Sequence, residues 1–144
     1  MNEEELPIPE ELDKLRQADR EDMQGAFICS RETFLELYKV EKRRSLREKT
    51  PRCLAHINLA GDLDSKQLLV LEEQLLKVIA RELRTGDLAC RWKKSHLVLL
   101  LPGAAREEAE GVLARLEKKF RQQHEIPEEL QLEKNIQEVE DLAN

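Results

Sequence analysis

The stretch that most constrains the fold is RTGDLACRWKKSHLVLLLPG, at residues 84–103. Two short apolar segments, Asp87 to Trp92 and His96 to Leu101, are separated by a Lys-Lys-Ser turn. This is the spacing of a tight β-hairpin, even though the turn lacks Gly and Asn. The second segment is a run of Leu and Val that a pleated sheet would bury, and a Pro-Gly pair ends it. The hairpin therefore predicts a β-sheet at the centre of the domain.

Amphipathic helices and further strands flank this hairpin in the sequence. Ser30 suits the N-cap of a helix expected at 31–50, and Asp64 or Ser65 that of a helix expected at 65–83. The wide apolar face of this later helix predicts burial on two sides. The last strand alternates apolar and polar residues and is expected near a sheet edge. Helices are expected at 10–23, 31–50, 65–83 and 104–124, and the additional strands at 52–61 and 129–139. This order predicts an α+β sandwich, with helices on one or both faces of a mainly antiparallel sheet.

The chain is expected to divide into a lead-in, one domain and a tail. Its 144 residues suffice for one domain with a real core and are too few for two of ordinary size. We expect an acidic lead-in with a linker helix at 1–25, the domain at 26–139 and a tail at 140–144. The narrow apolar stripe of the linker helix leaves three roles open: packing on the domain edge, pairing with a second copy as a short coiled coil, or ending an upstream domain.

Composition argues against several classes of function. The chain has 24 Lys and Arg residues against 30 Asp and Glu, and its net charge of −6 argues against direct nucleic-acid binding. Aromatic residues make up only 3%, which leaves little surface for stacking bases or sugars. The start of the chain lacks the pattern of a signal peptide, and no segment approaches the roughly 20 apolar residues of a membrane helix. Three isolated cysteines are typical of buried, reduced thiols. We therefore expect a cytoplasmic protein that binds neither nucleic acid nor membranes.

The sequence offers few groups for catalysis. No nucleophile elbow, Walker loop or dinucleotide fingerprint occurs, and the five glycines are scattered. His56 and His96 are candidates to face one another across adjacent strands, but no third metal ligand is evident. We therefore expect no metal and no cofactor. An enzyme with an unfamiliar site at these two histidines is the least favoured alternative.

Residues 84–103 resemble the segment that carries the signature of GGDEF domains, the diguanylate cyclases. That family has an Arg, two variable residues and an Asp, then a short strand ending in Arg and an aromatic or apolar residue, then Gly-Gly-Asp/Glu-Glu-Phe, then an apolar strand closing on Pro. Arg84, Asp87, Arg91 and Trp92 fall in register with this pattern, as does the strand VLLLPG. The resemblance covers about residues 31–138. It implies a nucleotidyl cyclase or ferredoxin-like sandwich, with a central, mostly antiparallel sheet of about four or five strands flanked by helices.

The sequence departs from the family at its catalytic positions. Two lysines replace the glycines that let the backbone approach the guanine nucleotide, and a serine and a histidine replace the two acidic residues, one of them a metal ligand. A histidine and an asparagine stand where the family has Asp-x-Asp on its first strand. Two divalent cations beside a triphosphate need several carboxylates, so we expect that the chain is not an enzyme. The degenerate former active site is expected at His56, Asn58, Lys93, Lys94, Ser95 and His96.

One family feature is retained, the pair Arg84-x-x-Asp87. In cyclases this pair forms an inhibitory site for the product cyclic di-GMP, and degenerate members that keep it can be receptors. An Arg can grip a phosphate or a guanine edge with two donors, and an Asp can accept from the guanine Watson–Crick edge. Arg84, Asp87 and, as an assisting group, Arg91 are therefore candidate ligand-binding residues. The alternative interpretation is an ordinary helix stop and turn.

Residues 25–47, GAFICSRETFLELYKVEKRRSLR, resemble the start of a GGDEF-like domain found at the C-terminal end of some bacterial transcriptional regulators. Those regulators carry a bacterial transcriptional activator domain upstream. The resemblance implies a non-catalytic regulatory module that contacts a protein partner or a second copy, by dimerisation through the lead-in helix or by signal relay. A receptor for cyclic di-GMP or another nucleotide is the alternative.

Overall fold

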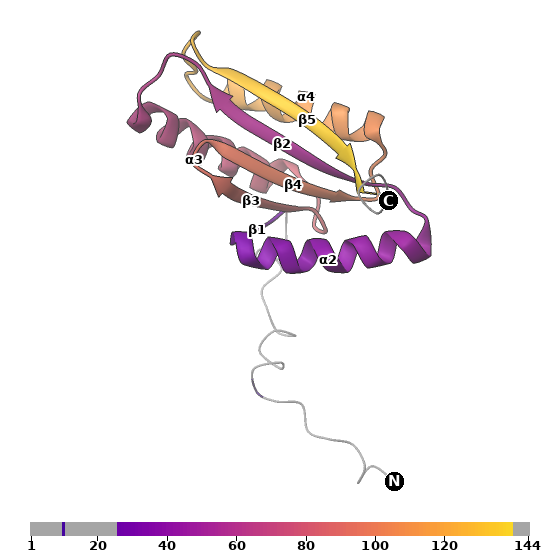
Figure 1. Ribbon diagram of the computed structural model, residues 1–144. Coiled ribbons are helices and arrows are strands. Elements are labelled where there is room, and N and C mark those ends of the chain that lie inside the picture. Colours follow the sequence, from indigo (N-terminus) through magenta and orange to yellow (C-terminus); the bar gives the residue numbers. More distant parts are fainter. Residues whose placement is uncertain (1–9, 11–25, 140–144) are drawn as a thin grey trace, which may run out of the picture.

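The computed structural model describes residue 10 and residues 26–139 (Figure 1). The strands of this part form one five-stranded sheet in the order β1-β3-β4-β2-β5. β1 pairs with β3 in parallel, and the other neighbouring strands are antiparallel. The expected α+β sandwich is confirmed. The elements are β1 (Phe27–Cys29), α2 (Arg31–Glu48), β2 (Arg52–Ala60), α3 (Ser65–Glu82), β3 (Leu88–Lys93), β4 (His96–Pro102), α4 (Arg106–Gln123) and β5 (Gln131–Glu138).

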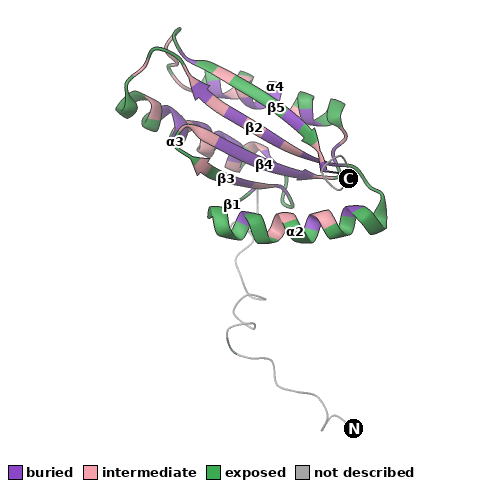
Figure 2. Cartoon of the chain, in the orientation of Figure 1, coloured by how far each residue is buried: buried purple, intermediate pink, exposed green. Residues whose placement is uncertain are grey.

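Helices cover both faces of the sheet and create two cores. In Figure 1, α3 and α4 lie behind the sheet, whereas α2 runs along its other side. Successive side chains of a strand point to opposite faces, so the strands supply both cores. The larger core includes Ile57 and Leu99 with the apolar faces of α3 and α4, and the smaller one joins Phe34 of α2 to Val98 and Leu100. Leu97 to Leu101 are almost fully buried, as the hairpin sequence predicts (Figure 2).

The helix α3 begins as expected, and it packs against both the sheet and α4. Asp64 is its N-cap, and Gln67 completes a capping box by bonding back to the Asp64 N–H. Leu75 and Ile79 are fully buried, whereas Leu69 and Val70 are 40% and 53% exposed. The expected burial on two sides therefore holds toward the sheet and α4, while Leu69 and Val70 lie on the exposed face.

A buried ion-pair network fixes α2 against the start of β2. Arg52 is 3% exposed, and its Nε donates to Glu41 Oε2 at 2.6 Å while its Nη2 donates to Glu48 Oε2 at 3.0 Å. Ser30 is the N-cap of α2, as expected. Burial of the guanidinium is offset by these two carboxylates, which together raise the pKa of Arg52. The network therefore sets where α2 lies across the sheet.

Two sequence-based expectations concern residues outside this part of the chain. The linker helix expected at 10–23 and the tail at 140–144 lie, apart from Glu10, beyond the described residues, and the division into lead-in, domain and tail stays a prediction. None of the helices described is long and apolar enough to cross a membrane. The short apolar segment after Gly25 is β1, which sequence periodicity does not reveal in three residues.

Candidate functional site

The β3–β4 hairpin turns over two residues, Lys94 and Ser95. Lys93, expected in the turn, belongs to β3 and lies opposite His96. Ser95 adopts φ 62°, in the left-handed region that two-residue hairpins usually fill with Gly or Asn. The Lys94 Nζ donates to Ser65 Oγ at 2.9 Å, at the start of α3. The turn therefore needs support from its surroundings.

That support comes from Glu72, a buried carboxylate on α3 that sequence reasoning missed. Its Oε1 accepts the Ser95 N–H at 2.7 Å, and its Oε2 pairs with Arg91 Nε at 2.8 Å. On the other side, the Ser95 carbonyl accepts the Leu59 N–H at 2.8 Å. Glu72 is 1% exposed. The available signal was an acidic residue between Leu71 and Leu75, on the buried stripe of an otherwise apolar helix.

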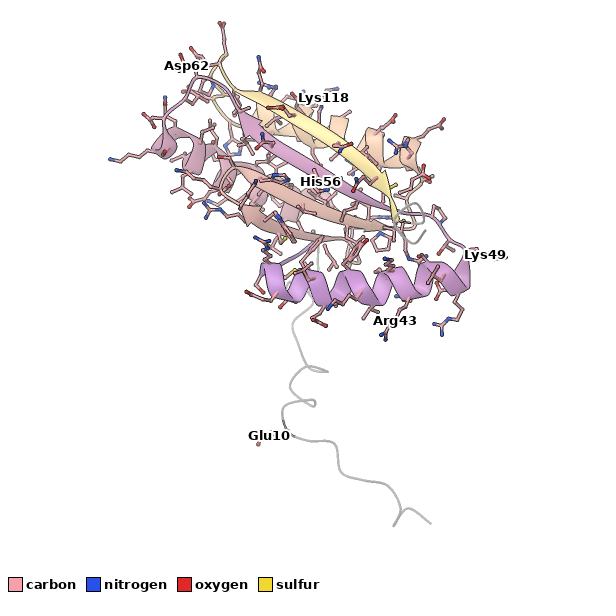
Figure 3. The ribbon with its side chains drawn as sticks, viewed as in Figure 1. Glu10, Arg43, Lys49, His56, Asp62 and Lys118 are labelled. Carbon is pink, nitrogen blue, oxygen red and sulfur yellow. The ribbon has the colours of Figure 1, made fainter. Side chains whose placement is uncertain are left out.

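The two histidines meet, as the strand assignment predicted. His56 Nδ1 lies 3.2 Å from His96 Nε2, and the rings are edge-to-face with centroids 5.4 Å apart. Burial, and then the neighbouring His96, lower the pKa of His56. Figure 3 places His56 in the middle of the sheet. Asn58 lies directly opposite His96 in the β2–β4 ladder, so these three signature-matched positions gather on one face.

Residues 26–139 contain no group of three or more His, Cys, Asp or Glu side chains arranged to hold a metal ion. An apolar cavity of about 230 Å³ lies instead beside His56, between α2 and the sheet. The Arg31 guanidinium covers Trp92 at the edge of this region, 3.9 Å from the ring centroid. Neither feature was expected from the sequence. The cavity is lined by Phe34, Leu35, Tyr38, Leu54, His56, Trp92 and Val98.

The structure brings Arg84 and Asp87 together, but it separates Arg91 from them. The buried Asp87 carboxylate accepts the Arg84 N–H at 3.0 Å and lies 3.3 Å from Arg84 Nη2, which also donates to the Pro102 carbonyl at 2.8 Å. Arg91 is bound to Glu72 and lies three residues along β3 from Leu88, about 10 Å at the usual strand rise. The assisting role of Arg91 stays a prediction.

Comparison with known proteins supports the fold assignment. No protein-family model and no curated protein sequence matches the chain, whereas solved structures do. A DGC protein from Thermotoga maritima has a TM-score of 0.61 and 15% identity, over 81% of this chain and 82% of that one. The diguanylate cyclase SiaD from Pseudomonas aeruginosa, in complex with its activator SiaC, has a TM-score of 0.66 and 20% identity, over 89% of this chain and 55% of that one. The coiled coil and GGDEF domain of DgcB from Caulobacter crescentus, in complex with c-di-GMP, has a TM-score of 0.65 and 14% identity, over 89% of this chain and 77% of that one.

These likenesses show that the chain has the fold of GGDEF diguanylate cyclase domains. They also correct the expectation that the chain is not an enzyme. The matching structures are diguanylate cyclases, which are enzymes, and nothing in the described residues shows that this chain is inactive. The expectation was wrong because it inferred inactivity from substituted signature residues alone.

Proposed function

We propose that the chain is a regulatory module with the GGDEF fold that acts through protein–protein contacts in a bacterial signalling or transcription regulator. The observation that carries the proposal is the internally anchored hairpin. Glu72 fixes the Ser95 N–H and Arg91, and Ser65 fixes Lys94. A hairpin held in this way presents a constant surface to a partner. Whether the chain also turns over a nucleotide is a separate question.

Two further observations support a contact role. The solved SiaD structure is a complex with a protein, its activator SiaC, so a domain with this fold takes part in a protein assembly. In this chain, Phe27 and Ile28 of β1 and Leu35 of α2 are large apolar side chains that remain exposed. Phe27 and Leu35 are therefore the side chains to test as part of a contact surface. The proposal includes a degenerate signature at Lys93 to His96 and a parent protein that regulates transcription.

Affinity capture from the native host tests this role. The chain is used as bait after chemical cross-linking, and the double variant Phe27→Ser/Leu35→Ser is compared with the wild type. We expect the wild type to retain a stoichiometric partner protein that the variant loses. Lys118→Glu, an exposed change on α4 (Figure 3), is the control that keeps the partner. Wild-type bait that retains neither a partner nor itself would contradict the proposal.

Catalysis is measured separately. Purified chain is incubated with GTP and Mg²⁺ or Mn²⁺, and the products are resolved by chromatography. The capture result does not depend on the outcome, because a protein contact and nucleotide turnover use different readouts.

A receptor for c-di-GMP is the second candidate function, and the Arg84–Asp87 turn favours it. The Arg84 side chain is 62% exposed although its Asp87 partner is buried, so part of the guanidinium faces solvent. DgcB was solved with this dinucleotide. Calorimetric titration with c-di-GMP, GTP and ATP is the test. A receptor gives heat with c-di-GMP that Arg84→Lys abolishes, because lysine lacks the two-donor geometry, while Arg81→Lys keeps it. No heat at high micromolar c-di-GMP would rule this candidate out.

A further inference from the structure

The strand β5 is a long, regular edge of the sheet. It pairs with β2 over Gln131–Glu138 without a register shift, and no other strand in the described residues pairs with its outer side. The opposite edge strand, β1, has only three residues. Proteins usually protect exposed edges with short strands, bulges, prolines or charges, because unpaired N–H and C=O groups recruit another strand. β5 has no bulge and no proline, and its charged residues are Glu133, Lys134 and Glu138.

The hydrogen-bond pattern of β2 shows which β5 residues face outward. The Leu59 N–H donates to the Ser95 carbonyl on the β4 side, so Leu59 and its odd-numbered neighbours on β2 direct their backbone groups toward β4. The even-numbered residues, such as His56, therefore bond to β5, where His56 lies opposite Asn135. Successive residues of a strand direct their N–H and C=O groups alternately to its two sides. Asn135 and the other odd-numbered residues of β5 therefore bond to β2, and the outer edge is formed by the backbone groups of Leu132, Lys134, Ile136 and Glu138.

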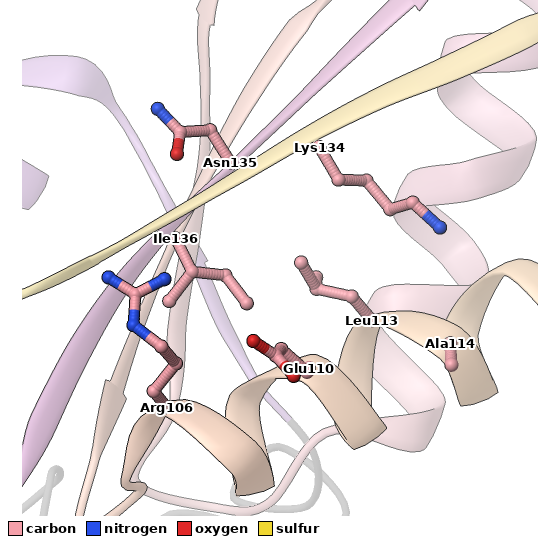
Figure 4. A pocket seen from close by; sticks show the side chains of 7 residues that line it. All are labelled: Arg106, Glu110, Leu113, Ala114, Lys134, Asn135 and Ile136. Atoms are coloured by element: carbon pink, nitrogen blue, oxygen red, sulfur yellow. The ribbon is translucent and has the colours of Figure 1, made fainter.

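A hollow lies beside this edge (Figure 4). Its volume is about 330 Å³, and Leu113 of α4 and Ile136 of β5 give it an apolar part. Arg106 and Glu110 stand at the start of α4 and Lys134 on β5, so the rim carries charges of both signs. Space is therefore available next to the edge for side chains of a strand added to it. The lining residues are Arg106, Glu110, Leu113, Ala114, Lys134, Asn135 and Ile136.

We propose that a second copy of this chain pairs its β5 antiparallel with this edge, about a two-fold axis at Ile136. The inference extends the protein-contact role proposed above to a second surface, at the edge of the sheet opposite β1. In this register each Ile136 exchanges hydrogen bonds with Ile136 of the partner subunit, and each Lys134 lies opposite Glu138 of the partner subunit. The continuous sheet that results is a symmetric interface in which one surface contacts its own copy.

Charge complementarity selects this register from those that the outward backbone groups allow. With the axis at Lys134, two lysines face each other, and with the axis at Glu133, two glutamates do. With the axis at Asn135, Lys134 faces Ile136. Of these four axes, only that at Ile136 places opposite charges directly across the new ladder, and it does so twice by symmetry. Like charges in that position are unfavourable, so the edge discriminates between registers as well as attracting its copy.

The side chains concerned are available for this pairing. Lys134 contacts Glu117 and Glu138 contacts Arg106 within the chain, both on the α4 face of the sheet. Lys134 and Glu138 nevertheless remain 34% and 40% exposed. In the dimer each joins a network of alternating charges. The backbone hydrogen bonds supply affinity, while the charges determine register.

Sedimentation velocity over a concentration series tests the proposal with a charge swap. We expect a reversible dimer for the full chain, and a dissociation constant raised at least about tenfold in Lys134→Glu or in Glu138→Lys, each of which puts like charges across the ladder. The double variant Lys134→Glu/Glu138→Lys restores opposite charges and the dimer. Lys118→Glu makes the same charge change on α4 and leaves the dimer intact. Circular dichroism confirms the fold of each variant.

Cross-linking provides a second measurement that does not depend on the charge variants. In the proposed register Asn135 faces Gln137 of the partner subunit in a non-hydrogen-bonded pair, with Cα atoms about 4.5 Å apart, within reach of a disulfide. In a Cys29→Ser background, Asn135→Cys mixed with Gln137→Cys is expected to cross-link on oxidation, and Asn135→Cys alone is not.

A monomer at every concentration, a dimer unaffected by the single charge changes, or a cross-link in Asn135→Cys alone would each overturn this pairing. These outcomes are distinct from failure of the contact role. Capture of a different protein by the wild type, lost in Phe27→Ser/Leu35→Ser, supports that role even if β5 does not pair with itself.

Discussion

The Nδ1 atom of His56 lies 3.2 Å from the Nε2 atom of His96, across the neighbouring strands β2 and β4. One of these nitrogens has to donate and the other to accept, so the hydrogen bond exists only while at least one ring is neutral. Two imidazolium ions would place two donors, and two positive charges, against each other. The proton state of the pair is therefore linked to the stability of this part of the sheet.

Acid is expected to destabilise the fold through His56. Burial, and then His96, lower the pKa of His56 from its ordinary value of 6.5, so the unfolded chain takes up this proton at a higher pH than the folded one. The contribution is present above about pH 6.5 and is lost as the pH falls from there through the lower pKa of the folded state. Urea unfolding at intervals between pH 5 and 8 measures it. His56→Asn is expected to flatten the dependence of the free energy of unfolding on pH. An unchanged dependence would show that His56 is not its source.

Glu72 is expected to be a large contributor to the stability of the hairpin. Glu72→Gln removes a buried charge that pairs with Arg91 and accepts the Ser95 N–H, and we expect the free energy of unfolding to fall by about 1–3 kcal/mol. Glu73→Gln, one residue along on the exposed face of α3, is the matched control and is expected to change it by less than about 0.5 kcal/mol. Equal effects in urea unfolding would show that Glu72 is not an anchor.

Gly61 is expected to tolerate no side chain. Its φ of 133° is strained for other residues, and a Cβ atom there would overlap the carbonyl oxygen of Glu129. We expect Gly61→Ala to lower the free energy of unfolding by at least about 2 kcal/mol. Gly111→Ala, in the open middle of α4, is expected to raise it by about 0.5–1 kcal/mol, because alanine favours a helix. Thermal unfolding of both variants checks that the free energy of unfolding changes in opposite directions.

Cys90 is expected to resist thiol reagents in the folded protein. Burial, and then the neighbouring Cys29, raise the pKa of Cys90 to about 11, so little thiolate exists at pH 8. Cys29 is only partly buried and is expected to be modified first, although slowly, because burial raises its pKa too. Mass spectrometry after timed labelling, with and without urea, distinguishes the two sites. Rapid modification of Cys90 without urea would contradict its burial.

Most of the fold follows from periodicity, because long elements repeat their pattern several times. The hairpin, the helix at 104–124 and the edge strand at 129–139 were found in this way, with boundaries shifted by one or two residues. β1 was not, since three residues repeat nothing and its pairing with β3 joins segments distant in the sequence. Parallel pairing of that kind is set by the assembled sheet rather than by local preference.

The candidate site was predicted less completely, for a different physical reason. Sequence spacing placed His56 near His96 and Arg84 near Asp87, because strand register and turn geometry are local rules. It could not show that Glu72 holds both Ser95 and Arg91, which depends on how α3 lies on the sheet. Arg91 was assigned to a ligand by its position in a motif, whereas a buried carboxylate already binds its guanidinium.

The strand order has a mechanical consequence. β1 and β5, the first and last strands described, lie at opposite edges of the sheet, separated by about 19 Å at the usual spacing of adjacent strands. Whatever precedes Phe27 and whatever follows Glu138 are attached to opposite sides of a stiff plate. Five hydrogen-bonded strands hold these two edges at this separation, which fixes the width of the sheet between its first and last described strands.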